Sequence, residues 1–429
     1  MVRSSVSRSP GRFPRLRRLT AAAVLAPVAV LIPAGTATAQ AGPGIGWQAD
    51  LSTVDGDDVN VRFDGALRLT EPRTGPAGDH GDLSDLGDLG DHGAGHEGQL
   101  LLPERALDRP VDRIRAEVDA VTPAGSAVHV SVRGRLDERT WTEWQPAPAV
   151  LPRPVRAVQV RIELRSGNPA GASPVVSAVR LTGENSGSTA APRAAVAEPL
   201  TYRVFATREG LVGGQTANGH IITARDHFVS FPSGKSLSPK GTGDYTVRVC
   251  REDRSRCEYA PVWEKGPWNI RDDYWNPSAQ RQMWQDLPQG KPEAQAAYQD
   301  GYNGGRDDKN RKVANPAGID LADGTYWDGL KLTGNAWVDI TYLWTGAGPT
   351  AVVGTEGGPL NVRADASTSA AIKGFAANYA KVTIECQIEG QTVTGRYGTS
   401  NIWHRIGQDH YVSDTYLQSG TGRPVAPKC

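Results

Sequence analysis

Alternating apolar and polar residues, with a period of two, recur along this chain of 429 residues. The runs 126–133, 157–164 and 175–181 each place their apolar residues on one face, as strands with one buried face do. We therefore predict that residues 45–184 form a β-sandwich with a jelly-roll look. Within it, the Gly-, Asp- and His-rich residues 73–98 indicate a disordered loop, and loose cation binding by its histidines is the alternative.

A linker rich in Ser, Ala and Pro, residues 185–199, leads to a second region in which the alternation resumes. Strand-like runs such as 202–206 and 336–344 predict that residues 200–346 form a β-barrel. A helical pattern occurs only within 277–302, where we expect a short helical insertion.

A third region, residues 355–429, carries short alternating runs at 360–363, 381–386 and 411–416, with Gly-, Ser- and Asn-rich turns between them. This pattern predicts a small barrel. The fold class expected for the whole chain is therefore mainly β, with a sandwich followed by two barrels.

The charge balance excludes one large class of partner. The 47 Lys and Arg residues match the 47 Asp and Glu residues, so the chain lacks the excess positive charge with which nucleic-acid binders attract phosphate. We expect no nucleic-acid partner, no cofactor and a monomer. We also expect no metal, because no histidine or further cysteine lies at zinc-ligand spacing around the cysteines.

The four cysteines suit two disulfides formed in an oxidising compartment. Three pairings are possible. We expect Cys250 to pair with Cys257, because these residues flank a turn between two strand-like runs, and Cys386 to pair with Cys429. Each bridge contributes about 2–4 kcal/mol to stability.

The first 41 residues have the composition of an export signal. Basic residues up to Arg18 precede an apolar run, 21–35, that is too short to span a membrane, and the small residues 37–39 suit cleavage by a signal peptidase. Arg17 and Arg18 leave the twin-arginine route open beside the ordinary secretory route. We expect a secreted or wall-associated protein with no membrane span after cleavage.

The third region contains Leu-Asn-Val-Arg at 360–363, Trp403 before a Gly turn and Tyr-Val-Ser-Asp-Thr-Tyr at 411–416. These motifs resemble the bacterial Src-homology-3-type (SH3b) domain of secreted proteins. The resemblance implies an SH3-like barrel that binds a cell-wall polymer, with peptidoglycan or another wall glycan as the partner. A barrel of the same fold without a ligand is the alternative.

Four segments of the second region follow one another in order: Thr-Ala-Asn-Gly at 216–219, His227 ahead of Pro232, Trp-Glu-Lys-Gly-Pro at 263–267 and Ile-Asp-Leu at 319–321. This order resembles the double-psi β-barrel of rare-lipoprotein-A-like and expansin-like proteins, which implies a six-stranded barrel. The chain departs from the family pattern in two places. Glu264 and Lys265 replace an Asp and an Arg, and one extra residue separates His227 from Pro232.

Carried over residue by residue, the resemblance makes Glu264, Asp320 and His227 the catalytic candidates. A glycosidic bond breaks when a carboxylic acid delivers a proton to the leaving oxygen, and burial against aromatic rings favours the protonated acid. Glu264, which lies beside Trp263, suits that role. A lytic transglycosylase needs one such acid, whereas hydrolysis needs a second carboxylate, here Asp320. The alternatives are a surface ion pair for Glu264, a turn cap for Asp320 and plain hydrogen bonding for His227.

The remaining candidates are substrate-binding residues of the same region: Asn218, His220, Trp263, Trp268, Tyr274 and Trp275. Aromatic rings crowded beside Glu264 suit stacking on the sugars of a glycan strand. They suit the small core of the insertion equally well. Trp141 and Trp144 in the first region leave the same two interpretations open.

Together these observations predict a secreted wall protein that binds, and cleaves or loosens, the glycan strands of peptidoglycan. The alternative is a non-catalytic protein that binds wall carbohydrate through the same modules. The sequence contains no serine elbow, zinc-protease, P-loop or dinucleotide motif, so enzymes of those classes are not indicated.

Overall fold

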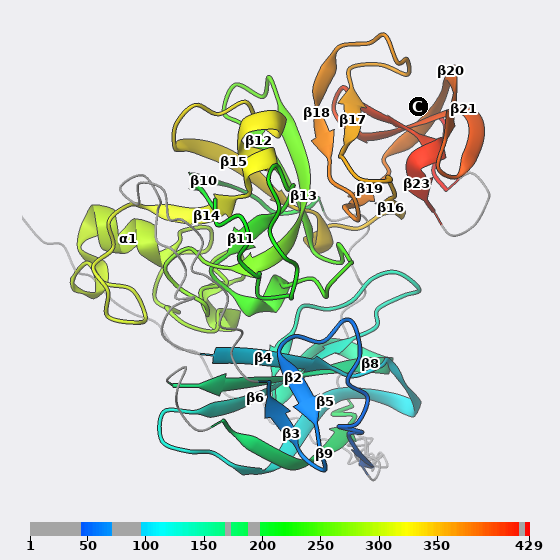
Figure 1. Cartoon of the computed structure of the whole chain (residues 1–429). Coiled ribbons are helices and arrows are strands. Elements are labelled where there is room, and N and C mark those ends of the chain that lie inside the picture. The colour runs from blue at the N-terminus through cyan, green and yellow to red at the C-terminus, as the bar shows by residue number, and fades with distance from the viewer. Residues whose placement is uncertain (1–43, 71–95, 168–172, 188–197, 420–424) are drawn as a thin grey trace, which may run out of the picture. The chain divides into compact units, whose positions relative to one another are not determined.

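The architecture is mainly β, as predicted. The computed structural model, drawn in Figure 1, describes residues 44–70, 96–167, 173–187, 198–419 and 425–429. The predicted export signal, residues 1–41, lies outside them. Most of the predicted loop 73–98 also lies outside them, and its last three residues instead begin strand β4 (His96–Leu101). No helix among the described residues is long and apolar enough to cross a bilayer.

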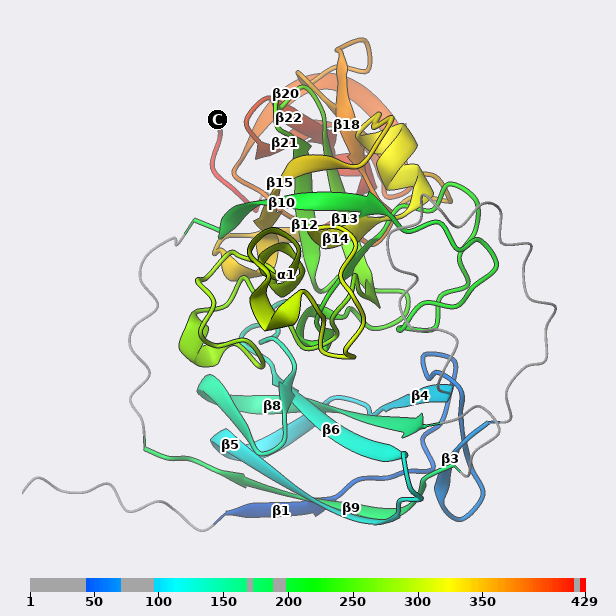
Figure 2. The same cartoon turned by 90° about the vertical axis from the view of Figure 1, so that its left-hand side faces the viewer.

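In the described residues, nine antiparallel strands form the first unit. They are β1 (Ile45–Gln48), β2 (Val61–Phe63), β3 (Leu67–Leu69), β4, β5 (Arg105–Val121), β6 (Ala127–Gly134), β7 (Gln145–Pro146), β8 (Ala149–Ser166) and β9 (Val175–Glu184). The long strands β5 and β8 pair with each other and then diverge, β5 toward β9 and β8 toward β4 and β6. In Figure 2, β4, β6 and β8 face β1, β5 and β9. Aliphatic side chains fill the space between these two layers, so the predicted sandwich is present.

Six strands close the central barrel. They are β10 (Thr201–Arg208), β11 (Val229–Phe231), β12 (Thr246–Arg251), β13 (Cys257–Lys265), β14 (Ala317–Leu321) and β15 (Ala336–Tyr342). Each pairs with two others in the cyclic order β10, β14, β11, β13, β12, β15 and back to β10. The pairs β10–β14 and β11–β13 are parallel, and the other four are antiparallel. The predicted closed six-stranded barrel is confirmed.

The segment between β13 and β14 contains the helical insertion. Helix α1 (Glu293–Asp300) covers its later part. The earlier part holds only the 3-10 turn Ser278–Gln280, because Trp284 has a left-handed φ of 62° that an α-helix does not accommodate. A buried ion pair between Arg281 and Asp272 holds this part of the chain in place.

The C-terminal module contains eight short strands among the described residues. They are β16 (Thr350–Val353), β17 (Leu360–Arg363), β18 (Ile372–Ala376), β19 (Lys381–Thr383), β20 (Cys386–Gly395), β21 (Gly398–Gly407), β22 (His410–Ser413) and β23 (Leu417–Gln418). Strand β16 pairs with β19 and β23, whereas β18, β17, β22, β21 and β20 follow one another in a second sheet. The module begins with β16, ahead of the predicted start at residue 355. Val362, Ile384 and Val412 lie in its core.

The C-terminal module continues the sheet of the central barrel. Strand β18 pairs in parallel with β13, so that Tyr259 lies opposite Ala376. Tyr259 also enters the core of the module, where its hydroxyl donates a hydrogen bond to the carbonyl oxygen of Ile406 at 3.0 Å. Barrel and module therefore share both backbone pairing and a hydrophobic core.

The sandwich is joined to the barrel through the segment that contains Trp141 and Trp144. Trp144 is only 1% exposed and packs in the core of the barrel, where its indole N–H donates to the carbonyl oxygen of Leu237 at 3.1 Å. In return, the hydroxyl of Tyr245 donates to the carbonyl oxygen of Thr142 at 2.6 Å. Both tryptophans are buried, which rules out the sugar-binding interpretation for them in this arrangement.

Both expected disulfides are present. Cys250 and Cys257 lie opposite each other on β12 and β13, with their Cα atoms 4.0 Å apart. Cys386 on β20 is bonded to the last residue, Cys429.

Truncating Trp144 to Ala should lower the free energy of unfolding by about 3–5 kcal/mol, because the change leaves a cavity in the barrel core. Urea denaturation would measure the loss. The matched control is Val121→Ala in the sandwich, where the side chain is 67% exposed and a change of no more than about 0.5 kcal/mol is expected. Equal effects of the two substitutions would contradict the assignment of Trp144 to the interface core.

Candidate functional site

The predicted acids Glu264 and Asp320 meet at one end of the barrel. Ser230 on β11 is the Cα partner of both, with Glu264 on β13 at one side and Asp320 on β14 at the other. Thr207 on β10 is in turn the partner of Asp320. Because directly paired residues project to the same face of a sheet, four strands place one row of polar side chains across this end of the barrel.

Glu264 is held by the Thr-Ala-Asn-Gly segment that the sequence comparison singled out. Its side chain, which is 2% exposed, accepts hydrogen bonds from the backbone N–H groups of Ala217 at 2.9 Å and Lys265 at 2.6 Å. Two amide N–H groups directed at one carboxylate accommodate a negative charge well. Glu264 therefore does not form the surface ion pair that was its alternative role.

Asp320 is 3% exposed and accepts a hydrogen bond from the hydroxyl of Thr207. Gly266 passes close to the same carboxylate. A β-carbon on Gly266 would lie 3.2 Å from Oγ of Ser230 and 3.8 Å from Oδ2 of Asp320. The absence of a side chain at Gly266 thus allows the turn after Glu264 to approach Asp320.

A third acid, Glu209, joins this site, although the sequence analysis did not select it. Its backbone N–H donates to the carbonyl oxygen of Leu321 at 2.8 Å, which extends the β10–β14 ladder beyond Thr207. Burial raises the pKa of Glu209 well above its usual value, and the nearby charges of Asp320, Glu264 and Asp323 raise it further. The sequence signal that could have identified Glu209 is an acid directly after a strand that enters the barrel.

Lys265, which stands where the resembling family has Arg, links this end of the barrel to the sandwich. Its ammonium lies 3.1 Å from Oε2 of Glu97 and 3.5 Å from Oε1 of Glu163. The Lys265 charge lowers the pKa of Glu97. The residue next to Glu264 is therefore held by acids of β4 and β8.

The structure does not bring His227 to these acids. Its Nδ1 lies 2.7 Å from Oε1 of Glu258, and Glu258 precedes Glu264 by six residues, or about 20 Å, along β13. The His227 ring packs edge-on against Phe375 of β18. His227 is thus part of the contact between the barrel and the C-terminal module rather than a third member of the acid site.

The pKa values of both members of the buried His227–Glu258 pair are raised. Burial raises the pKa of Glu258 to about 7. Burial alone would favour the neutral His227 ring, but the Glu258 carboxylate overrides it and raises the pKa of His227.

Asn218 and His220 shape the loop that holds Glu264. The Asn218 side chain is fully buried, where it donates to the carbonyl oxygen of Ser238 at 3.1 Å and accepts from the hydroxyl of Thr216 at 2.7 Å. His220 Nε2 lies 2.7 Å from Oδ2 of Asp226. Through these contacts, Asn218 positions the loop rather than contacting a substrate directly.

The four aromatic residues predicted to bind sugar are all buried, which favours the alternative that they pack in the protein core. Trp263 stacks on Phe228, and Trp268 donates its indole N–H to the side chain of Asn315. Tyr274 and Trp275 lie in the barrel core and have no exposed surface. These rings therefore pack against protein and offer little surface to a glycan.

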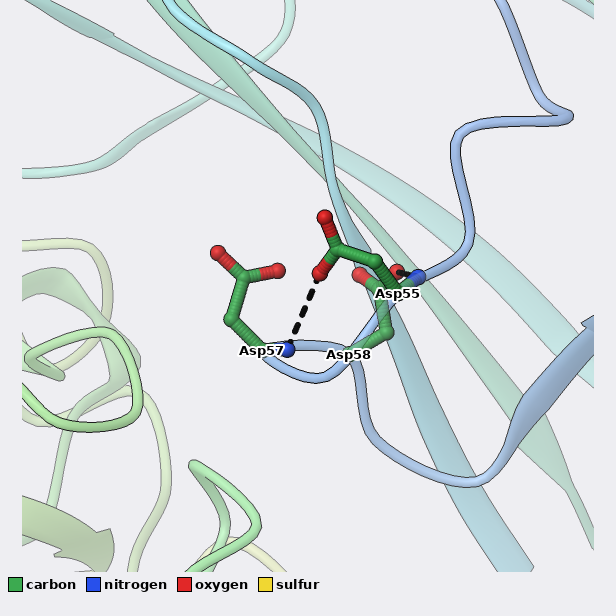
Figure 3. A group of neighbouring side chains, drawn as sticks. All are labelled: Asp55, Asp57 and Asp58. Atoms are coloured by element: carbon green, nitrogen blue, oxygen red, sulfur yellow. Dashed lines mark hydrogen bonds between the residues drawn. The ribbon is translucent and has the colours of Figure 1, made fainter.

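Three acids of the sandwich, Asp55, Asp57 and Asp58, gather in the loop before β2 (Figure 3). One carboxylate oxygen of each lies within 4.8 Å of the others, a spacing that could hold a metal ion. Among the described residues, this is the group of acids found with that spacing. Two of the carboxylates already accept N–H groups of the same loop, Asp55 from Asp57 at 3.0 Å and Asp58 from Asp55 at 2.7 Å. These internal hydrogen bonds explain the cluster as the framework of a tight turn.

The acid site at the end of the barrel contains what proton-transfer chemistry needs. Glu264 and Asp320 accept hydrogen bonds, whereas Glu209 lies among negative charges in a buried position. Different surroundings move the pKa values of neighbouring carboxyl groups apart, which is how paired acids serve as donor and acceptor in other proteins.

Comparison with known proteins adds relatives without assigned activities. A family described as a domain of unknown function, DUF8814, matches residues 200–341. Two curated proteins of Bacillus subtilis (strain 168), the uncharacterised proteins YraI and YraJ, are each 39% identical to this chain over 83 residues, which cover 18% of this chain and 70% of the relative. No solved structure matches the chain.

Replacing Glu258 with Gln tests the buried pair it forms with His227. Both groups have raised pKa values, so the folded protein retains protons that the unfolded chain would release, and stability must fall as the pH rises toward and through about 7. Between about pH 5 and pH 8 we expect the wild type to lose on the order of 2 kcal/mol more unfolding free energy than Glu258→Gln. Urea denaturation at each pH measures both slopes, and identical slopes would refute this account of the pair.

Proposed function

The chain belongs to the family of the Bacillus subtilis proteins YraI and YraJ, which are uncharacterised, so we propose a function from the geometry of the chain itself. We propose that the protein is exported and that its central barrel cleaves or loosens the glycan strands of peptidoglycan. The observation that carries the proposal is the meeting of Glu264 and Asp320, far apart in sequence, on either side of Ser230. The two disulfides are compatible with an oxidising compartment outside the cytoplasm.

The chemistry follows from the carboxyl groups. Cleavage of a glycosidic bond requires a proton for the leaving oxygen and a nucleophile at the sugar carbon. A nearby carboxylate activates the nucleophile, which is water in hydrolysis and a hydroxyl of the sugar itself in a lytic transglycosylase. The site supplies more than one acid in a setting that water enters only slightly, where electrostatic effects on the reacting groups are strong.

A second candidate function is non-catalytic binding of wall carbohydrate. The low exposure of Glu264 and Asp320 favours it, because a glycan strand must come very close to the barrel end to reach either acid. The burial of the four predicted stacking rings also removes the binding groove expected beside them. Under this hypothesis the acid site stabilises the barrel, and the surface of the C-terminal module binds the polymer.

Digestion of purified peptidoglycan separates the two functions. We expect the wild type to release soluble muropeptides, and Glu264→Gln and Asp320→Asn each to lower the rate at least about a hundredfold, as measured by chromatography of the soluble fraction. Glu356→Gln, a substitution of an exposed acid in the C-terminal module, is the matched control and should retain the wild-type rate. Retained sedimentation with the wall and no soluble product from the wild type would establish the binding function instead.

Wall binding by the C-terminal module needs point substitutions rather than deletion. Removing the module would expose the edge of β13 and the side chain of Tyr259, so a truncated chain would test folding as well as binding. Tyr379 and Tyr397 are exposed rings of this module, and exposed aromatic faces suit stacking on sugars.

We expect the double substitution Tyr379→Ala with Tyr397→Ala to reduce sedimentation with purified cell walls at least about fivefold. The matched control is Tyr298→Ala, which removes an exposed ring from helix α1 of the insertion. Sedimentation that is unchanged by the double substitution, or reduced equally by the control, would contradict wall binding through these rings.

A further inference from the structure

We propose that Glu209 is the proton donor of the acid site, a neutral carboxylic acid in the resting protein, and that Asp320 and Glu264 are its ionised partners. The assignment rests on the proposed cleavage of a glycosidic bond and goes beyond it by naming the donor. It also reassigns Glu264, which the sequence suggested as the acid, to the role of an anion.

The path of the chain directs Glu209 toward the other acids. Thr207 and Glu209 are two residues apart where β10 runs out along β14, so their side chains project to the same side. Thr207 donates to the carboxylate of Asp320, which establishes that this side faces the site. Glu209 therefore follows Thr207 along the face that carries Asp320.

The hydrogen bonds distinguish the three acids. Glu264 receives two backbone N–H groups, and Asp320 receives a hydroxyl. The side chain of Glu209 is 7% exposed, and its Oε2 is a buried atom without a hydrogen-bond partner. A buried carboxylate with no donor is costly, whereas the neutral acid avoids most of that cost.

The charges around Glu209 lead to the same assignment. In the described part of the chain, no cation pairs with its side chain, because the neighbouring Arg208 is committed to Asp323 at 2.9 Å. Asp320 and Glu264 are both close enough for their negative charges to raise the pKa of Glu209. A carboxyl group placed beside two anions and buried from water keeps its proton at neutral pH.

The proposed step balances as follows. Glu209 gives its proton to the glycosidic oxygen, and the bond from that oxygen to the sugar carbon breaks with both electrons going to the oxygen. The hydroxyl of water, or of the sugar itself, forms the new bond at that carbon. Asp320 or Glu264 accepts the proton that this hydroxyl loses, and transfer of one proton back to Glu209 completes the cycle.

The central experiment is the substitution Glu209→Gln in the full chain, which preserves size but cannot donate an acidic proton. We expect muropeptide release to fall at least about a hundredfold while sedimentation with cell walls is unchanged, with Glu356→Gln as the control at the wild-type rate. In the wild type, release should decrease as the pH rises through the raised pKa of Glu209, because the protonated form is lost. Release by Glu209→Gln at the wild-type rate would overturn the proposal.

A measurement without substrate separates this proposal from the proposed function. An infrared difference spectrum between wild type and Glu209→Gln at neutral pH should show the carbonyl band of a neutral carboxylic acid in the wild type. A carboxylate band in its place overturns the assignment whatever the activity. If the wild type shows the neutral acid but releases no muropeptide, the cleavage function fails and with it the donor role, while circular dichroism of both proteins establishes that each is folded.

Discussion

Strand β10 closes the central barrel, and the rest of this unit depends on that closure. One edge of β10 pairs in parallel with β14, and the other pairs antiparallel with β15. Without β10, the strands would form an open sheet with unpaired backbone N–H and C=O groups on two edges. Closure sets the registers, and the registers place Thr207 beside Asp320 and put Ser230 between Asp320 and Glu264. The acid site is thus a consequence of how the barrel closes.

Buried polar groups and aromatic rings, in addition to strand pairing, join the modules. Glu143 of the sandwich accepts the indole N–H groups of Trp275 at 2.6 Å and Trp344 at 2.8 Å, and burial raises the pKa of this carboxyl. Arg133 lies over the ring of Trp144 and pairs with Asp244 at 2.9 Å. Such contacts are directional, and loss of one partner leaves a buried polar group unsatisfied. These contacts join the sandwich to the barrel.

The three carboxyl groups of the acid site are chemically alike but have different surroundings. Glu209, Glu264 and Asp320 are all carboxylic acids close to one another, so their differences come from backbone donors, hydroxyl donors and burial. The Thr-Ala-Asn-Gly loop contributes one of these donors, and the buried amide of Asn218 keeps that loop in position. This arrangement suits both acid–base catalysis and a purely structural role. The two roles differ in whether a sugar reaches the three acids.

Period-two runs such as 157–164 predicted the strands, the barrel and the sandwich correctly, because the alternation of buried and exposed faces is a local property. Spacing also sufficed to pair the four cysteines, whereas the resemblance to the double-psi β-barrel proteins, carried over residue by residue, selected Glu264 and Asp320. The sequence could not indicate that Trp268, Tyr274 and Trp275 are covered by protein, since burial depends on how the insertion folds back. Nor could it separate His227 from the acids or add Glu209 to them. Those relations are set by register and chain direction between strands distant in sequence, and only the closed barrel determines both.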